Sequence, residues 1–164
     1  MPKTPIELLQ QMPIFGAVRE DALQLLTAAQ ATVEVAQGDY FFFEGDPGQG
    51  MYVLESGRAA VLKSWGGRVL HLRQLGRGDC FGEMALLDLY PRSASVRAEE
   101  DCRAIYVTPG DLMRLYEHDV EQFAVVQMNL AREMCRRLRL TDDMLFQVAV
   151  GEASPVADSA FATL

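Results

Sequence analysis

The hydrophobic positions at the start of the chain recur at helical spacing. Pro5 suits a first helical turn, and the pattern is interrupted by Pro13 and Gly16 before it resumes. The apolar residues of this region are Ile6, Leu8, Leu9 and Met12, followed by Ala22, Leu23, Leu25, Leu26 and Ala29. The pattern predicts N-terminal helices over residues 5–30.

Between residues 32 and 107 the pattern changes to short apolar or alternating runs, which are typical of strands. The runs are Thr32–Ala36, Tyr40–Phe43, Met51–Leu54, Ala59–Lys63, Val69–Leu72, Ala94–Ala98 and Arg103–Val107. Glycine-bearing turns separate them, and Gly66-Gly67 between two runs indicates a hairpin. Short strands at near-regular spacing predict an antiparallel sandwich or barrel over residues 32–107.

Helices are predicted again over residues 109–149. Thr108 suits an N-cap, Pro109 the first helical position and Asp111 the first turn. A long helix is expected from about residue 119 to residue 149, because apolar residues recur there at helical spacing. This stripe consists of Phe123, Val126, Leu130, Met134, Leu138, Leu145 and Val148, and Thr141 is its single polar member. Residues 151–164 are expected to form a flexible tail.

The composition is that of one soluble domain, which we expect over residues 1–150. A chain of 164 residues buries enough surface to fold without disulfides or metal. Its formal charge of −8 argues against a general nucleic-acid binder. No apolar run reaches membrane length and the N-terminus does not resemble a signal peptide, so we expect no membrane contact. Cys80, Cys102 and Cys135 lie far apart, as reduced thiols of a cytoplasmic protein would.

Candidate chemistry is concentrated in residues 81–96. Gly82 permits an unusual backbone path, and residues 83–89 have a helix-compatible composition that Pro91 ends. The start of a helix offers unpaired N–H groups to an anion, and Arg92 carries a planar guanidinium suited to phosphate. Ser93 adds a hydroxyl, and Glu83 could accept protons from sugar hydroxyls. The alternative, in which the segment binds no ligand, is a surface ion pair between Glu83 and Arg92.

This segment resembles the phosphate-binding cassette of the cyclic nucleotide-binding domain family. The family pattern F-G-E-φ-A-L-φ, a short variable stretch and P-R-S/T/A-A-S/T-V is present without a gap, as Phe81–Leu87 and Pro91–Val96. Gly45, Gly57 and Gly78 fit the surrounding turns, and the similarity extends over roughly residues 14–149. The resemblance implies an α+β fold: an antiparallel β jelly-roll barrel with N-terminal helices, a short phosphate-binding helix and a long C-terminal helix.

The resemblance also implies roles for individual residues. Arg92 would hold the cyclic phosphate, Glu83 would accept the ribose 2′-hydroxyl, and Gly82 would let the chain approach the ligand. The remaining ligand-binding residues would be the backbone amides near Met84, Ala85 and Ala94, the Ser93 hydroxyl, and the base-pocket residues Met84, Val69 and Leu72.

In this family the helix after the barrel covers the base and moves when ligand binds. The run 134–141 resembles that helix, and Thr141 would then touch the purine; a tolerated threonine at a helix contact is the alternative. The 119–149 helix could form a homodimer through its apolar stripe, or pack on its own barrel. Arg132, Arg136, Arg137 and Arg139 suggest a solvated face or dimer rim, or else a patch for an acidic partner.

The expected function is a sensor that binds cAMP, or else cGMP, and signals to an unknown effector protein in trans. We expect no catalytic residue, no cofactor and no metal, because His71 and His118 lie too far apart for the ligand cluster of a β-barrel metalloenzyme. One alternative keeps the fold as an interaction module without ligand. Another is a transcription regulator, but the residues after the long helix are too few for a helix-turn-helix, so no DNA contact is expected.

Overall fold

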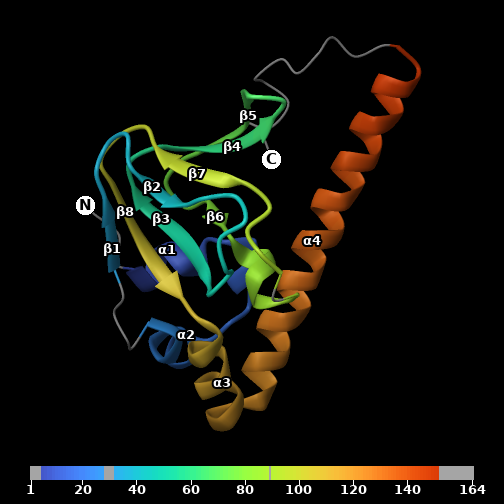
Figure 1. The fold of residues 1–164 in the computed structure, drawn as a ribbon. Helices are drawn as coiled ribbons and strands as arrows, with labels where there is room; N and C mark the ends of the chain where they lie inside the picture. Colours follow the sequence, from blue (N-terminus) through green and yellow to red (C-terminus); the bar gives the residue numbers. More distant parts are fainter. Residues whose placement is uncertain (1–4, 28–31, 89, 152–164) are drawn as a thin grey trace.

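The computed structural model describes residues 5–27, 32–88 and 90–151, and opens with short helices (Figure 1). These are α1 (Pro5–Gln10), the 3-10 turn η1 (Pro13–Phe15) and α2 (Glu20–Thr27). The helical pattern breaks at Pro13 and Gly16, as the sequence predicts. Ala29, at the end of the predicted helical region, lies outside the described residues.

The β region forms two four-stranded antiparallel sheets within the described residues (Figure 1). Its strands are β1 (Thr32–Val35), β2 (Tyr40–Phe42), β3 (Met51–Ser56), β4 (Ala59–Trp65), β5 (Arg68–Leu75), β6 (Cys80–Phe81), β7 (Ser95–Ala98) and β8 (Cys102–Val107). The sheet orders are β1-β8-β3-β6 and β2-β7-β4-β5. Eight strands divided in this way make a jelly roll, which confirms the expected fold class.

The sheet that contains β3 and β8 is apolar on both faces. Val53 pairs with Ile105, and both side chains face a core shared with the helices. The next pair, Leu54 and Ala104, faces the core between the two sheets. Because side chains alternate along a strand, one sheet thereby anchors the helices on one side and closes the jelly roll on the other.

The predicted hairpin and strands are found, with one addition. Gly66 and Gly67 both adopt positive φ between β4 and β5, as a tight two-residue turn requires. The addition is the strand β6, which pairs with β3. It has only two residues, so its sequence is too short to show an alternating pattern. It leads directly into Gly82 and therefore positions the candidate site.

Two helices follow the jelly roll: α3 (Pro109–His118) and α4 (Val120–Ala149). Thr108 and Asp111 form a reciprocal capping box at the start of α3, which confirms the predicted N-cap. The Asp119 side chain accepts from the Gln122 N–H at 3.1 Å and starts α4. The predicted helical region thus divides at residue 119 into two separately capped helices.

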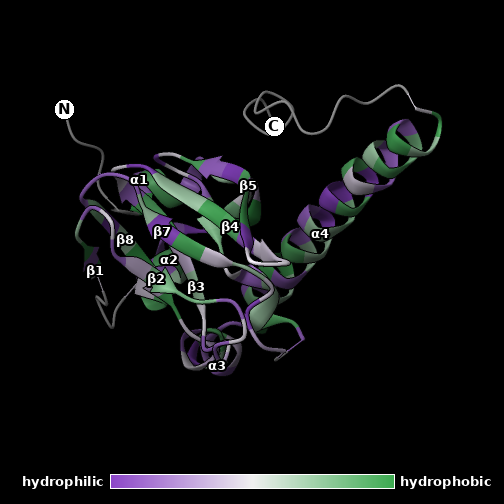
Figure 2. Cartoon of the chain, turned by 45° about the horizontal axis from the view of Figure 1, so that its top comes forward, coloured by the Kyte–Doolittle hydropathy of each residue, from purple (hydrophilic) through white to green (hydrophobic). Residues whose placement is uncertain are grey.

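The two halves of α4 lie in different environments. Val126 and Leu130 are 1% and 0% exposed, and the Asn129 side chain donates to the Gly16 carbonyl at 2.7 Å. Leu138 and Leu145, by contrast, are 61% and 62% exposed. Figures 1 and 2 show this second half extending past the jelly roll, with hydrophobic and hydrophilic residues both on its surface. Residues 152–164 of the expected tail lie outside the described residues.

Candidate functional site

The candidate site is built around a buried arginine. Arg92 is 7% exposed, and its backbone is fixed by two hydrogen bonds to the turn at Gly45 and Asp46, of 2.9 and 2.8 Å. The guanidinium donates from Nη1 to the Gly82 carbonyl at 2.9 Å and lies 4.1 Å from the centre of the Phe42 ring. Burial lowers the pKa of Arg92, but an arginine side chain remains charged in a protein.

Gly82 is required for this arrangement. Its φ of +74° is left-handed, and a Cβ at this position would lie 2.5 Å from Nη1 of Arg92. Gly48 makes a similar close approach, because a Cβ there would lie 2.6 Å from the Cβ of Ala85. The first contact lies within the segment itself, between Gly82 and Arg92, whereas the second places Ala85 directly against the loop before β3.

Glu83 begins the 3-10 helix η2 (Glu83–Leu86) and is 3% exposed. Its Oε1 forms an ion pair with Arg137 of α4, so the surface pair with Arg92 considered above is not what the structure shows. In this site, Oε2 of Glu83 and Nε of Arg92 are buried and have no hydrogen-bond partner among the described residues. Such orphaned groups cost free energy, of the order of 1–3 kcal/mol each, unless a ligand or water completes them.

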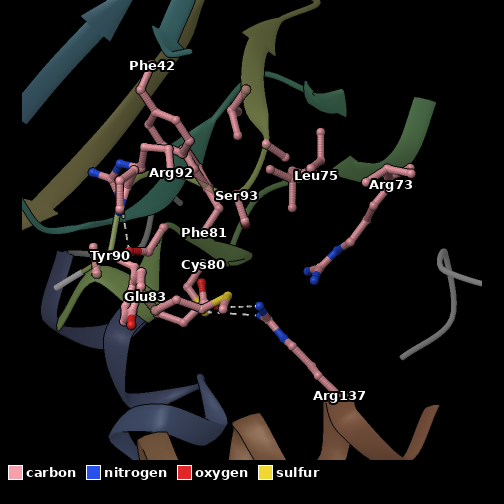
Figure 3. A pocket seen from close by; sticks show the side chains of 18 of the residues that line it. Phe42, Arg73, Leu75, Cys80, Phe81, Glu83, Tyr90, Arg92, Ser93 and Arg137 are labelled. Carbon is pink, nitrogen blue, oxygen red and sulfur yellow. Dashed lines mark hydrogen bonds and ion pairs between the residues drawn. The ribbon is translucent and has the colours of Figure 1, made fainter. Parts of the chain in front are cut away.

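These residues line a pocket of about 560 Å³ between the two sheets, η2 and α4 (Figure 3). Of the predicted ligand-binding residues, those in the lining are Gly82, Glu83, Met84, Ala85, Arg92, Ser93, Ala94, Leu72 and Thr141. The fold thus brings these residues to one cavity, although they come from three separate segments of the sequence.

Val69 is the exception. It is 66% exposed near the tip of the β4–β5 hairpin, where it pairs with Ser64, and it does not line the pocket. The hairpin extends beyond the cavity, so that only residues nearer its base, such as Leu72, reach the lining. The structure therefore does not bring Val69 together with the other predicted base-pocket residues.

The predicted helix over residues 83–89 is also shorter than expected. Among the described residues it ends at Leu86, as a single 3-10 turn. The Ala85 N–H, expected to face an anion, donates instead to the Gly82 carbonyl at 3.3 Å. The anion-binding character of the site consequently depends more on the Arg92 side chain than on a helix end.

Two arginines of the lining were not singled out for binding by the sequence. Arg73 of β5 and Arg137 of α4 both extend toward the pocket in Figure 3. Arg137 stands four residues before Thr141, on the same helix face, and this spacing is the signal that could have identified it. Arg73 has no such signal, because it follows Leu72 in a strand whose bulge alters the alternation.

Cys80 forms part of the pocket wall, and its thiol is unreactive. Burial, together with the neighbouring Glu83 charge, raises the pKa of its thiol to about 12. Burial also raises the pKa of Cys102, while Cys135 is exposed on α4. Since the thiolate is the reactive form, the three cysteines differ sharply in reactivity.

The structure thus combines a jelly roll with a buried arginine and a buried carboxylate that line one cavity. A family model described as "Cyclic nucleotide-binding domain" matches residues 32–119, more than half of the chain. The chain belongs to the cyclic nucleotide-binding domain family.

The chain is similar to several characterised relatives. It is 33% identical over 142 residues to the cyclic AMP receptor protein of Thermus thermophilus, covering 86% of this chain and 64% of that protein. It is 37% identical over 107 residues to a cAMP-dependent protein kinase regulatory subunit of Emericella nidulans, covering 65% of this chain and 26% of that protein. The chain therefore spans less than two thirds of either relative.

Solved structures agree with this assignment. The crystal structure of Thermus thermophilus catabolite activator protein matches with a TM-score of 0.74 and 33% identity, over 84% of this chain and 63% of that chain. The N-terminal domain of a transcriptional regulator from Streptomyces coelicolor matches with a TM-score of 0.70 and 32% identity, over 84% and 94% of the two chains.

Two properties of the described residues concern membranes and metal ions. No helix in this part of the chain is long and apolar enough to cross a membrane. The same residues contain no group of three or more histidine, cysteine or acidic side chains placed to hold a metal ion.

The thiol environments lead to a direct prediction. In dilute solution, where the chains are separate, an aromatic disulfide reagent at about pH 8 should modify one cysteine per folded chain, Cys135, because burial disfavours the thiolate of Cys80 and Cys102. In denaturant all three cysteines should react, and Cys135→Ser should abolish the fast native reaction. Rapid modification of Cys80 in the folded protein would contradict the closed pocket wall.

Proposed function

We propose that this domain is a regulatory sensor that binds cAMP and signals to a partner protein. The observation that carries the proposal is that two residues lining one cavity each keep a buried polar atom without a partner, a donor on Arg92 and an acceptor on Glu83. A cyclic nucleotide offers a phosphate anion and a ribose hydroxyl, which are complementary to these two groups. The names of the Thermus and Emericella relatives support cAMP as the ligand.

In this proposal the Arg92 guanidinium pairs with the cyclic phosphate and Oε2 of Glu83 accepts from the ribose 2′-hydroxyl. Ser93, and the backbone near Met84, Ala85 and Ala94, complete the sugar-phosphate side of the pocket. Leu72 and the Met84 side chain contact the base, together with Thr141. The Thr141 hydroxyl already donates to the Arg137 carbonyl at 3.0 Å, so it would serve the base as an acceptor.

Signalling would pass through α4. This helix contributes Arg137 and Thr141 to the pocket, and its second half is not packed on the jelly roll. A ligand that contacts α4 in one of two positions shifts the population toward that position by its difference in affinity. The effector protein that reads this shift is not defined by the site. Reduced cysteines fit action in the cytoplasm.

Calorimetric titration tests the proposal. We expect cAMP to bind with micromolar or better affinity, and Arg92→Ala to lose about 2–5 kcal/mol of binding free energy because the buried phosphate loses its charged partner. Arg77→Ala, which removes an exposed arginine outside the pocket, is the matched control and should bind normally. Absence of heat at high micromolar cAMP would favour an interaction module without ligand, and a loss below about 0.5 kcal/mol for Arg92→Ala would place the phosphate elsewhere.

A second candidate ligand, cGMP, is favoured by Arg73. Its side chain is 19% exposed, lines the pocket, and lies 3.8 Å from Asp79, at the long end for an ion pair. Guanine presents two acceptors on one edge, which match the guanidinium fork, whereas adenine presents an acceptor beside a donor. Arg73 is therefore the residue to test for base selection.

We expect cAMP to bind more tightly than cGMP in parallel titrations. Arg73→Leu should weaken cGMP by about 1–3 kcal/mol, the usual contribution of an arginine–guanine pair, and leave cAMP nearly unchanged. Arg68→Leu, at the exposed end of the same strand, controls for loss of charge. Tighter binding of cGMP that disappears in Arg73→Leu would establish the second candidate. Equal losses for both nucleotides would exclude a role in base selection.

We also propose a homodimer through the exposed face of α4. Exposed residues on this helix recur with alternating steps of four and three, the heptad spacing of a coiled coil. They are Ala124, Met128, Ala131, Cys135, Leu138, Asp142, Leu145 and Ala149. We call these eight residues the seam. The seam shares Leu138 and Leu145 with the stripe predicted from the sequence. Val126 and Leu130 of that stripe are instead buried against the rest of the same chain.

The seam places Cys135 opposite its copy in a parallel pair. Mild oxidation should therefore give a disulfide-linked dimer on non-reducing electrophoresis. Cys135→Ser should lack the covalent link and migrate as a single chain on the same gel. Leu138→Glu, which puts a charge in the seam, should lower cross-linking together with the mass measured by sedimentation. A monomer at high micromolar concentration in sedimentation would contradict the proposed dimer.

A further inference from the structure

Glu133 is a buried carboxylate on α4 that does not line the pocket. It is 7% exposed and accepts three hydrogen bonds from two arginines. Arg136 donates from Nε and Nη2 at 2.9 and 2.7 Å, and Arg137 donates from Nε at 2.9 Å. Although burial acts in the opposite direction, these two arginines hold the pKa of Glu133 below its usual range, so it is ionised at neutral pH.

Only one of these arginines reaches the site. With Nε held by Glu133, the Nη1 of Arg137 contacts Glu83 and its Nη2 lies 3.7 Å from the Cys80 sulfur. Figure 3 shows Arg137 reaching from α4 across to η2 and β6. Arg136 is not part of the pocket lining, although it makes more bonds to Glu133.

The position of Arg137 has an electrostatic consequence for an anionic ligand. Glu83 is a buried carboxylate in the same cavity as Arg92, and its negative charge repels a phosphate unless a cation neutralises it. Arg137 is that cation, but a long arginine side chain has many rotamers, and holding it costs conformational entropy. A second buried carboxylate that fixes its Nε lowers the number of orientations open to it.

We propose that Glu133 is a positioning residue for ligand binding: it orients Arg137 toward Glu83 and affects nucleotide affinity only through Arg137. This inference rests on the proposed function, because it concerns affinity for the same nucleotide. The competing explanation is that Glu133 only stabilises α4 through its intrahelical pairs with Arg136 and Arg137. The two explanations differ in whether a change at Glu133 still matters once Arg137 is gone.

A double-mutant cycle on the full chain separates them, with cAMP affinity measured by calorimetry and the unfolding midpoint measured for each variant. Glu133→Gln and Arg137→Gln should each weaken cAMP about 5- to 30-fold, within the range of coupled neighbouring residues. The double variant should bind within about 2-fold of Arg137→Gln alone. Arg136→Gln is the matched control, because it breaks two bonds to Glu133 outside the pocket, and it should bind within about 2-fold of the wild type.

Several results would overturn the inference. These are wild-type affinity in Glu133→Gln, multiplicative losses in the double variant, or a loss in Arg136→Gln as large as in Glu133→Gln. If Glu133→Gln is unfolded at the assay temperature, Arg137→Lys is the variant to measure. Lysine keeps the positive charge but cannot contact Glu133 and Glu83 at the same time. A folded Arg137→Lys variant must therefore bind cAMP more weakly than the wild type. Failure of the wild type to bind cAMP would instead overturn the proposed function itself.

Discussion

The burial of the Arg92 guanidinium is the constraint on which the rest of the site depends. A charged group at 7% exposure must be compensated, and here the Gly82 carbonyl and the Phe42 ring compensate only part of it. Gly82 has to be a glycine so that the chain can pass Nη1, and the turn at residues 45–46 has to pair with the Arg92 backbone. Nε of Arg92 is buried without a hydrogen-bond partner among the described residues, so this lining residue keeps a donor that an anion could use.

The second charged group, Glu83, connects this cavity to α4. Its ion pair with Arg137 joins the short 3-10 helix of the jelly roll to the middle of the long helix, at the point where α4 leaves the protein body. The same helix is buried at Leu130 and exposed at Leu138, so the pair stands between an anchored half and an uncovered half. In the proposed function, this arrangement is how a ligand in the pocket would change the position of α4.

The sequence predicts the fold class and most of the site because their determinants are local. Gly82 to Ala94 lie within one segment, and Thr108 with Asp111 form a cap over four residues. Arg73 and Arg137 reach the pocket only through tertiary packing, and the exposure of Val69 follows from how far a hairpin extends beyond the cavity. The two-residue strand β6 and the short η2 are likewise set by pairing with β3 and by the backbone at Gly82, not by periodicity.

We propose that Arg92 and Glu83 are held in place for the two polar ends of a cyclic nucleotide. A crystal structure of the protein grown with cAMP is the sharpest test of this proposal. A phosphate oxygen should lie within hydrogen-bond distance of Arg92 Nε and the ribose 2′-hydroxyl on Oε2 of Glu83, with the base toward Leu72 and Thr141. A nucleotide bound with its phosphate away from Arg92, or outside this pocket, would contradict it.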